Sequence, residues 1–287
     1  MMSLTAPARS AGDRLLLAAD GTPVMAWHDP GPVDGLVDGL VDGLVDGAGR
    51  PLAFVVAHGF TVHARRPGVR SVVAALRAVG GVVSFDFRGH GLSGGASTVG
   101  DLEVEDLEVA VRWARELGYA RVVTVGWSMG ASVVVRHAAL GRCPVDAVVA
   151  VSGPSRWHFR GTAPMRLLHL GVETRLGRAV LARLFGTRVA ASGWDPVPEP
   201  PDAVVGRIAP TPLLLVHGDA DRYFPLDHAR WLAVAAGPGA ELWEVPGFGH
   251  AEAAVGPALL DRIARWVTGV TGAVGTGEGG TSARMPA

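Results

Sequence analysis

The chain has 287 residues, of which 48% are hydrophobic, and its formal net charge is −1. This length can bury one sizeable core, and the near-neutral charge excludes a general attraction to nucleic acid. The single cysteine, Cys143, excludes an intramolecular disulfide. We expect a cytoplasmic protein with no stable membrane insertion, because residues 1–13 lack a signal-peptide core and no stretch reaches the roughly 18 apolar residues of a membrane helix.

Residue types that bind metals show no pattern typical of a metal site. The spacing H-E-x-x-H does not occur, and one cysteine cannot build the thiolate sites of structural zinc. We therefore expect neither a metal ion nor another cofactor.

The first predicted elements form a hairpin. Residues 14–19 and 24–28 are rich in apolar side chains and flank Asp20-Gly21, a dipeptide typical of tight turns between strands. The sheet is therefore expected to open with two antiparallel strands.

A repeat of Val-Asp-Gly-Leu, nearly four units long, fills residues 33–47. A period of four with a glycine in every unit fits neither a helix nor strand alternation, which predicts a flexible, low-complexity loop. A calcium-binding array is the alternative, since Asp34, Asp38, Asp42 and Asp46 recur. Their spacing is not that of known Asp-Gly calcium repeats, which favours the loop.

After the repeat, predicted strands and helices alternate along the chain. This order is typical of a mostly parallel sheet that is covered by helices on both faces. The predicted strands are 52–57, 122–125, 145–151, 212–218 and 240–246, and the predicted helices are 69–79, 101–118, 131–140 and 259–266.

A candidate nucleophile lies between a predicted strand and a predicted helix, in the sequence Gly126-Trp127-Ser128-Met129-Gly130. A tight turn at this place strains the backbone of the serine, and side chains at the two glycine positions would collide across it. Such a turn presents the serine hydroxyl at the edge of the sheet. We expect the N–H of Met129 to be an oxyanion donor, because it lies at the start of the helix.

An acid and a histidine follow in the order that a catalytic triad on such a sheet requires. The strand 212–218 leads into Asp219-Ala220-Asp221, and the strand 240–246 is followed by a turn that ends in His250. His250 is the candidate general base, and either aspartate can be the acid.

Two further motifs complete a resemblance to a known family. His58-Gly59-Phe60 follows the strand 52–57, and residues 86–93 read D-x-R-G-x-G-x-S. Together with the serine turn and the acid and histidine loops, they resemble the α/β-hydrolase fold superfamily, in particular its esterase-like and lipase-like serine hydrolases. The resemblance covers about residues 14–268.

The resemblance implies a roughly eight-stranded, mostly parallel sheet with an inserted helical cap. It implies a core and a cap, and the composition of the chain adds the repeat loop and a tail that we expect to be disordered. These parts are residues 14–152 and 202–268 for the core, 153–201 for the cap, 33–47 for the loop and 269–287 for the tail.

The resemblance also implies roles for individual residues. Asp221 becomes the acid, because the family's loop commonly reads His-Gly-x-x-Asp, as residues 217–221 do. Asp219 is then a turn-forming residue and the fallback acid. The amide of Phe60 becomes the second oxyanion donor. Within the D-x-R-G-x-G-x-S motif of residues 86–93, structural roles are implied for Asp86, Arg88 and His90.

The cap has an unusual composition. Seven arginines and one acidic residue, Glu173, lie between residues 156 and 190, among apolar residues at loosely helical spacing. One interpretation is a basic, amphipathic cap that favours anionic or membrane-surface substrates. The other is a pair of ordinary cap helices with solvated arginines. Aromatic residues expected to line the substrate pocket are Trp127, Trp157, Phe159 and Trp194.

These features predict a serine hydrolase that cleaves a small carboxylic ester or thioester through an acyl-enzyme. A serine at position 128 argues against the dehalogenase and epoxide hydrolase chemistry of the superfamily, which uses an aspartate there. An acyltransferase with the same triad and a non-catalytic, ligand-binding sensor remain alternatives.

Overall fold

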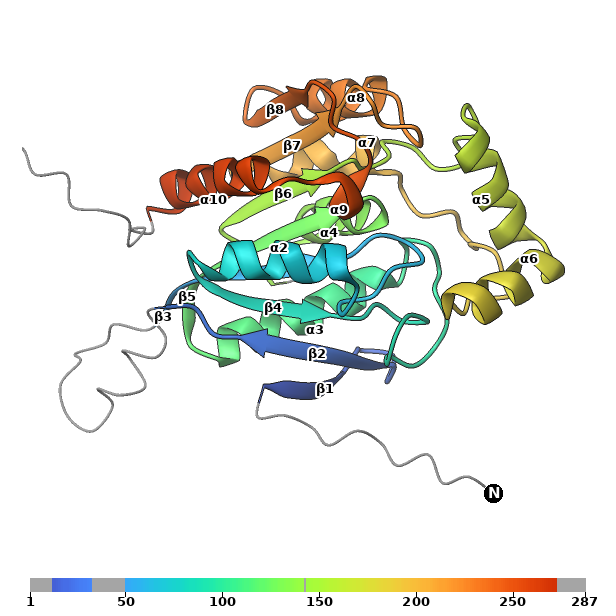
Figure 1. The fold of residues 1–287 in the computed structure, drawn as a ribbon, viewed down its shortest axis with the longest axis horizontal. Coiled ribbons are helices and arrows are strands. Elements are labelled where there is room, and N and C mark those ends of the chain that lie inside the picture. Colours follow the sequence, from blue (N-terminus) through green and yellow to red (C-terminus); the bar gives the residue numbers. More distant parts are fainter. Residues whose placement is uncertain (1–11, 33–49, 142, 273–287) are drawn as a thin grey trace, which may run out of the picture.

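A central sheet covered by helices on both faces dominates the computed structural model, which describes residues 12–32, 50–141 and 143–272 (Figure 1). Within these residues, eight strands form the sheet in the order β1-β2-β4-β3-β5-β6-β7-β8. Strand β2 is antiparallel to both of its neighbours, and every pairing from β4 to β8 is parallel. The predicted fold class and opening hairpin are therefore confirmed. The strands are β1 (Asp13–Leu17), β2 (Pro23–Asp29), β3 (Arg50–Ala57), β4 (Gly81–Phe85), β5 (Tyr119–Trp127), β6 (Ala147–Val151), β7 (Leu213–Gly218) and β8 (Ala240–Val245).

The helices pack on the sheet through apolar faces, as the periodicity of the sequence predicts. The core helices are α2 (Pro67–Arg77), α3 (Glu103–Glu116), α4 (Met129–Leu140), α7 (Pro201–Val204), η2 (Val205–Ile208), α8 (Asp227–Ala236), α9 (Ala251–Ala254) and α10 (Pro257–Thr271). Helix α2, for example, buries residues at spacings of three and four along one side, from Val69 to Leu76. Pro67 at its start and Arg77 in its last turn suit the two ends of a helix.

Both faces of the sheet are buried, so its central strands are mostly apolar, and every residue of β6 is alanine or valine. Successive residues of β3 point to opposite faces. Val55 packs in the cluster that includes α3 and α4, whereas Phe54 packs in the cluster that includes α2 and α10. This rigid double layer holds the carboxyl ends of the parallel strands, and the loops that follow them, in fixed positions.

The cap is inserted between β6 and β7. It contains α5 (Ala163–Glu173), α6 (Arg175–Val180) and a π-helical turn, η1 (Leu181–Phe185). In Figure 1, α5 and α6 stand apart from the sheet, beyond the loops at one end of its strands. Residues 186–200 contain no helix, so the helical part of the insertion is shorter than the range 153–201.

Two expectations fall partly or wholly outside the described residues. The repeat at 33–47 lies outside them, and so do residues 273–287 of the expected tail. Residues 269–271, which we also assigned to the tail, are the last turn of α10. Among the described residues, no helix is both long enough and apolar enough to cross a membrane.

Candidate active site

The turn between β5 and α4 holds Ser128 in a strained backbone conformation. Its φ is 53° and its ψ is −114°, a region that non-glycine residues rarely occupy. A Cβ atom at Gly126 would collide with the carbonyl of Gly130, and a Cβ atom at Gly130 would collide with the carbonyl of Ala57. The steric requirement predicted for both glycines is therefore confirmed, and Ser128 sits at the N-terminus of α4.

Ser128, His250 and Asp221 form one chain of hydrogen bonds. The Nε2 atom of His250 lies 2.9 Å from the Oγ atom of Ser128, and its Nδ1 atom lies 2.7 Å from Oδ2 of Asp221. With the proton on Nδ1, the ring donates to the carboxylate and its Nε2 accepts from the hydroxyl. The structure thus brings together three side chains that are up to 122 residues apart.

The loop after β7 fixes Asp221 and separates it from Asp219. The Asp221 side chain is fully buried, and its Oδ1 accepts hydrogen bonds from the N–H groups of Tyr223 (2.7 Å) and Phe224 (3.1 Å). Asp219 instead accepts from the N–H of Gly247, at 2.7 Å, in the turn before the histidine. Asp219, the alternative candidate for the acid, therefore stabilises that turn and is not hydrogen-bonded to His250.

Two contacts hold the loop that carries His250. The N–H of Ala251 donates to Oγ of Ser152, which follows β6, over 3.1 Å. The ring of Tyr223 stacks on the imidazole with 4.3 Å between the ring centres. The histidine is consequently held from the sheet side by a hydrogen bond and on one ring face by an aromatic side chain.

His58 orients the peptide that carries the predicted amide of Phe60. The N–H of Phe87 donates to Nε2 of His58 over 3.1 Å, so the proton of this histidine is on Nδ1, which donates to the carbonyl of Gly59 over 2.8 Å. Complete burial lowers the pKa of His58 well below its usual value, which keeps the ring neutral. In a trans peptide the N–H points opposite to the carbonyl, so this bond fixes the direction of the Phe60 N–H.

Glu252 is a site residue that sequence reasoning missed. Its buried carboxyl accepts a hydrogen bond from the N–H of Gly59 over 3.0 Å. A Cβ atom on Gly59 would lie 3.1 Å from this carboxyl and 3.4 Å from Cβ of Ser128. Burial raises the pKa of Glu252. The glutamate therefore ties the loop of His250 to the loop of Phe60, directly beside the serine.

The D-x-R-G-x-G-x-S motif of residues 86–93 supports the loop that carries Phe60. Asp86 accepts from the N–H of Ala64 over 2.7 Å and thereby holds the segment after Phe60. Arg88 is buried and pairs with the carboxylate of Asp106 at 2.7 Å. His90 is buried too, with Nδ1 3.0 Å from the carbonyl of Arg88. These contacts fit the structural roles that the resemblance implies.

A cavity of about 570 Å³ opens over Ser128 and extends under the cap. Phe60 and Met129 line it beside the serine, and Trp157, Phe159 and Trp194 line it farther out. The two tryptophan rings lie 5.2 Å apart, and each indole N–H donates to a backbone carbonyl. The wall is thus mainly aromatic and aliphatic, as in many small-molecule sites.

Trp127 is not part of this cavity, contrary to our expectation. Its side chain is completely buried and packs in the core cluster with Val123 and Val125. Residues 123, 125 and 127 share one face of β5, because strand residues alternate between faces. The neighbouring position 128 faces the cavity, whereas position 127 contributes to the core on the other side.

One group of side chains in the cap has the chemistry of metal ligands. The ligand atoms of His158, His169 and Glu173 lie within 4.8 Å of one another. Glu173 is already neutralised by Arg160 (2.5 Å) and accepts a hydrogen bond from His169 (2.8 Å). The ring of His158 lies against those of His169 and Trp194, so each of the three side chains already has a partner within the cap.

The structure is similar to several solved structures, among them an esterase and a serine hydrolase. The esterase Pf2001 of Pyrococcus furiosus is 22% identical over 89% of this chain and 91% of its own, with a TM-score of 0.64. Est1E from Butyrivibrio proteoclasticus is 18% identical over 91% and 100% of the two chains, with a TM-score of 0.57. A serine hydrolase without a lid from Xanthomonas campestris is 18% identical over 96% and 100%, with a TM-score of 0.56. At these identities the likeness shows a shared fold.

The sequence itself matches a family model. No curated protein matches the chain significantly. The model described as "Alpha/beta hydrolase family" matches residues 54–262, which span β3 to α10 and include the serine, acid and histidine loops. The chain therefore belongs to the alpha/beta hydrolase family.

Proposed function

We propose that the protein is a serine hydrolase that cleaves carboxylic esters, or the related thioesters, through an acyl-enzyme. The observation that carries the proposal is the hydrogen-bonded chain from Ser128 through His250 to Asp221, with the serine on a strained turn at a helix N-terminus. Membership of the alpha/beta hydrolase family supports hydrolysis as the reaction class.

In the first half-reaction, Oγ of Ser128 attacks the carbonyl carbon of the ester while its proton moves to Nε2 of His250. Asp221 keeps the ring in the required tautomer and stabilises the imidazolium that forms. The N–H groups of Phe60 and Met129 hold the developing oxyanion. The bond to the leaving alcohol or thiol then breaks, and His250 returns the proton to that group.

In the second half-reaction, a water molecule attacks the acyl-enzyme. His250 takes a proton from the water as its oxygen bonds to the acyl carbon, and the same amides hold the second oxyanion. The bond between the acyl carbon and Oγ of Ser128 breaks, and the proton returns to the serine. The carboxylic acid leaves, and the enzyme has its starting protonation state.

The cavity favours an apolar substrate. Its volume of about 570 Å³ suits a small molecule, and Met165, Leu168 and Val172 of α5 extend the aromatic wall. Burial of each methylene group contributes about 0.8 kcal/mol. We expect kcat/KM to rise with acyl chain length until the cavity is filled.

A fluorophosphonate probe tests the nucleophile directly. The probe esterifies an activated serine, and intact mass reports the added group. We expect labelling of the parent protein and none of Ser128→Ala. Ser132→Ala is a matched control, because Ser132 also lines the cavity but its hydroxyl contacts the carbonyl of Pro154. A folded parent that is not labelled, or a labelled Ser128→Ala, would overturn the proposal.

Hydrolysis and acyl transfer are then separated by product analysis. With a graded series of nitrophenyl esters in water, a hydrolase releases the free acid at the same rate as the phenol. If product forms only when an alcohol, amine or thiol is added, and carries the acyl group on that acceptor, the protein is an acyltransferase and not a hydrolase.

A further inference from the structure

The cap carries apolar side chains on two opposite sides. Met165, Leu168 and Val172 of α5 line the cavity. Leu167 and Leu170 lie on the other side of the same helix and are 70% and 58% exposed. A helix that is apolar on both sides normally packs against two partners. Among the described residues, none covers Leu167 or Leu170.

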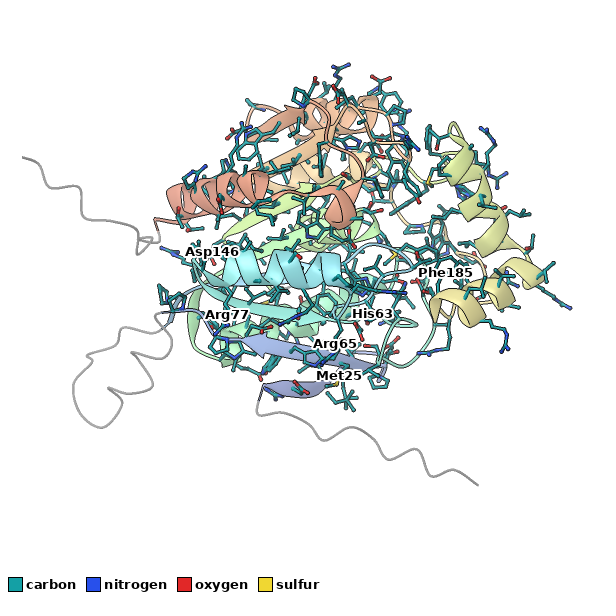
Figure 2. The ribbon with its side chains drawn as sticks, viewed as in Figure 1. Met25, His63, Arg65, Arg77, Asp146 and Phe185 are labelled. Carbon is teal, nitrogen blue, oxygen red and sulfur yellow. The ribbon has the colours of Figure 1, made fainter. Side chains whose placement is uncertain are left out.

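The second part of the cap also exposes apolar side chains. Leu176, Val180 and Leu184 recur at intervals of four residues, and all three are exposed, whereas Leu181 between them is buried. Helices α5 and α6 approach closely where Gly171 meets Gly177. Figure 2 shows side chains projecting from both helices away from the sheet. The cap outer face, as we define it, is Leu167, Leu170, Leu176, Val180 and Leu184.

Positive charge surrounds the cap outer face. Between residues 163 and 185 there are four arginines and one acidic residue, Glu173, which is paired with Arg160. Within the described part of the chain, Arg175 and Arg183 form no ion pair. By contrast, Arg166 and Arg178 donate to backbone carbonyls within the cap. Exposed leucines interleaved with unpaired arginines are typical of helices that lie in the interface of an anionic bilayer.

We propose that the cap outer face docks on an anionic lipid surface, and that the substrates of the active site are acyl esters drawn from that surface. The substrate part rests on the proposed esterase function. The leucines would enter the boundary between headgroups and acyl chains while the arginines contact lipid phosphates. The cavity lies on the other side of α5, about one helix diameter, roughly 10 Å, from the docked surface.

A second copy of the chain is the competing occupant of the cap outer face. Two copies that met through this face would bring Arg175 and Arg183 of each toward those of the other. Like charges that are brought together and desolvated oppose such a contact. An anionic surface satisfies the leucines and the arginines together, which is why the charge pattern favours lipid.

Vesicle binding by Ser128→Ala tests the docking without hydrolysis of the lipid. The protein is sedimented with phosphatidylcholine vesicles that either contain phosphatidylglycerol or lack it. We expect binding that rises with phosphatidylglycerol and falls with salt. Because each arginine near an anionic surface contributes about fivefold, Arg175→Gln with Arg183→Gln should bind about thirtyfold more weakly. Leu176→Gln with Leu184→Gln should lose at least about tenfold.

The matched control combines Arg265→Gln on α10 with Val234→Gln on α8, where Val234 is 83% exposed. It should bind like the parent. Equal binding to neutral vesicles, no effect of the cap substitutions, or a dimer that these substitutions dissociate would overturn the docking proposal. Fluorophosphonate labelling in solution is read separately on the parent. If the parent is labelled but does not bind vesicles, only the docking proposal is wrong. If it binds vesicles but is not labelled, the proposed esterase function and the proposed lipid substrates are wrong.

Discussion

The loops at the carboxyl ends of the strands carry Ser128, Asp221 and His250, and we call this region the catalytic edge. It differs from the cap in how firmly its side chains are held. At the edge, Asp221 is fully buried and His250 is bonded on both ring nitrogens, so each position has several partners. In the cap, large apolar residues such as Leu167 and Leu176 are exposed to 70% and 77%. We therefore propose that the edge carries out the reaction and that the cap selects what reaches it. Four substitutions or conditions test this division.

The largest effect is expected from the acid. Asp221→Asn should lower kcat about ten-thousandfold, because an amide donates toward the histidine and stabilises the wrong tautomer. Steady-state kinetics with a soluble ester measure this loss. Asp219→Asn, the matched control, weakens only the bond to Gly247. A single bond of about 1 kcal/mol predicts a loss of about fivefold at most. Similar losses for both variants would show that the acid is misassigned.

The catalytic edge and the cap should also differ in how much the loss of a leucine side chain lowers the free energy of unfolding. Leu214 of β7 is completely buried in the core cluster that includes α2 and α10, whereas Leu176 of α6 is exposed. Leu214→Ala should lower the free energy of unfolding by about 2–5 kcal/mol. Leu176→Ala should change it by less than about 0.5 kcal/mol. Urea denaturation measures both. A large loss for Leu176→Ala would mean that the cap outer face is buried in solution.

A buried histidine where the cap meets the core should make the stability of the fold depend on pH. His228 of α8 accepts a hydrogen bond from the N–H of Ser155, at the base of the cap, over 3.1 Å. Burial lowers its pKa from 6.5 to about 4. The unfolded chain therefore binds a proton below pH 6.5 that the folded chain binds only near pH 4. This group contributes stability above pH 6.5, and that stability is lost as the pH falls toward 4.

The loss from His228 should reach about 3 kcal/mol by pH 4, since one pKa unit corresponds to about 1.4 kcal/mol. His228→Asn keeps an acceptor for the Ser155 N–H but does not titrate. Urea denaturation from pH 7 to pH 4 should show a shallower decline for this variant than for the parent. Parallel declines would mean that the histidine does not couple protonation to folding.

The sequence predicts the parts of this site whose requirements are local. Gly126 and Gly130 are needed by the turn in which they lie, so their spacing identifies Ser128. The order of the acid and histidine loops follows from parallel strands that end at one edge of the sheet. Period-two alternation along β5 also contains the information that Trp127 faces the core.

Other features could not be predicted, because the partners are far apart in the chain. Glu252 and Gly59 are separated by 193 residues, and a glutamate in the first turn of a short helix is ordinarily a solvated residue. The exposure of Leu167 and Leu170 likewise depends on where α5 sits relative to the core. Their spacing alone fits an ordinary packed helix equally well.

The smallest effect is expected from Glu252, which joins two loops of the catalytic edge. Glu252→Ala leaves the N–H of Gly59 without its acceptor, and a buried unpaired group costs about 1–3 kcal/mol. If part of that cost appears only when the Phe60 amide meets the oxyanion, kcat should fall about tenfold while KM stays constant. Steady-state kinetics on a short soluble ester measure the two constants separately.

Glu252→Gln is the matched variant, because its amide oxygen can still accept from Gly59. If Glu252 acts only as the acceptor for the Gly59 N–H, the glutamine should restore kcat to within about threefold of the parent. If the glutamine loses as much as the alanine, the charge acts on the histidine. If neither variant loses activity, the loop of Phe60 is held by His58 and Asp86 alone. The first result would contradict a role through the Gly59 hydrogen bond alone, and the second would remove Glu252 from the catalytic edge and leave it as part of the packing beneath that edge.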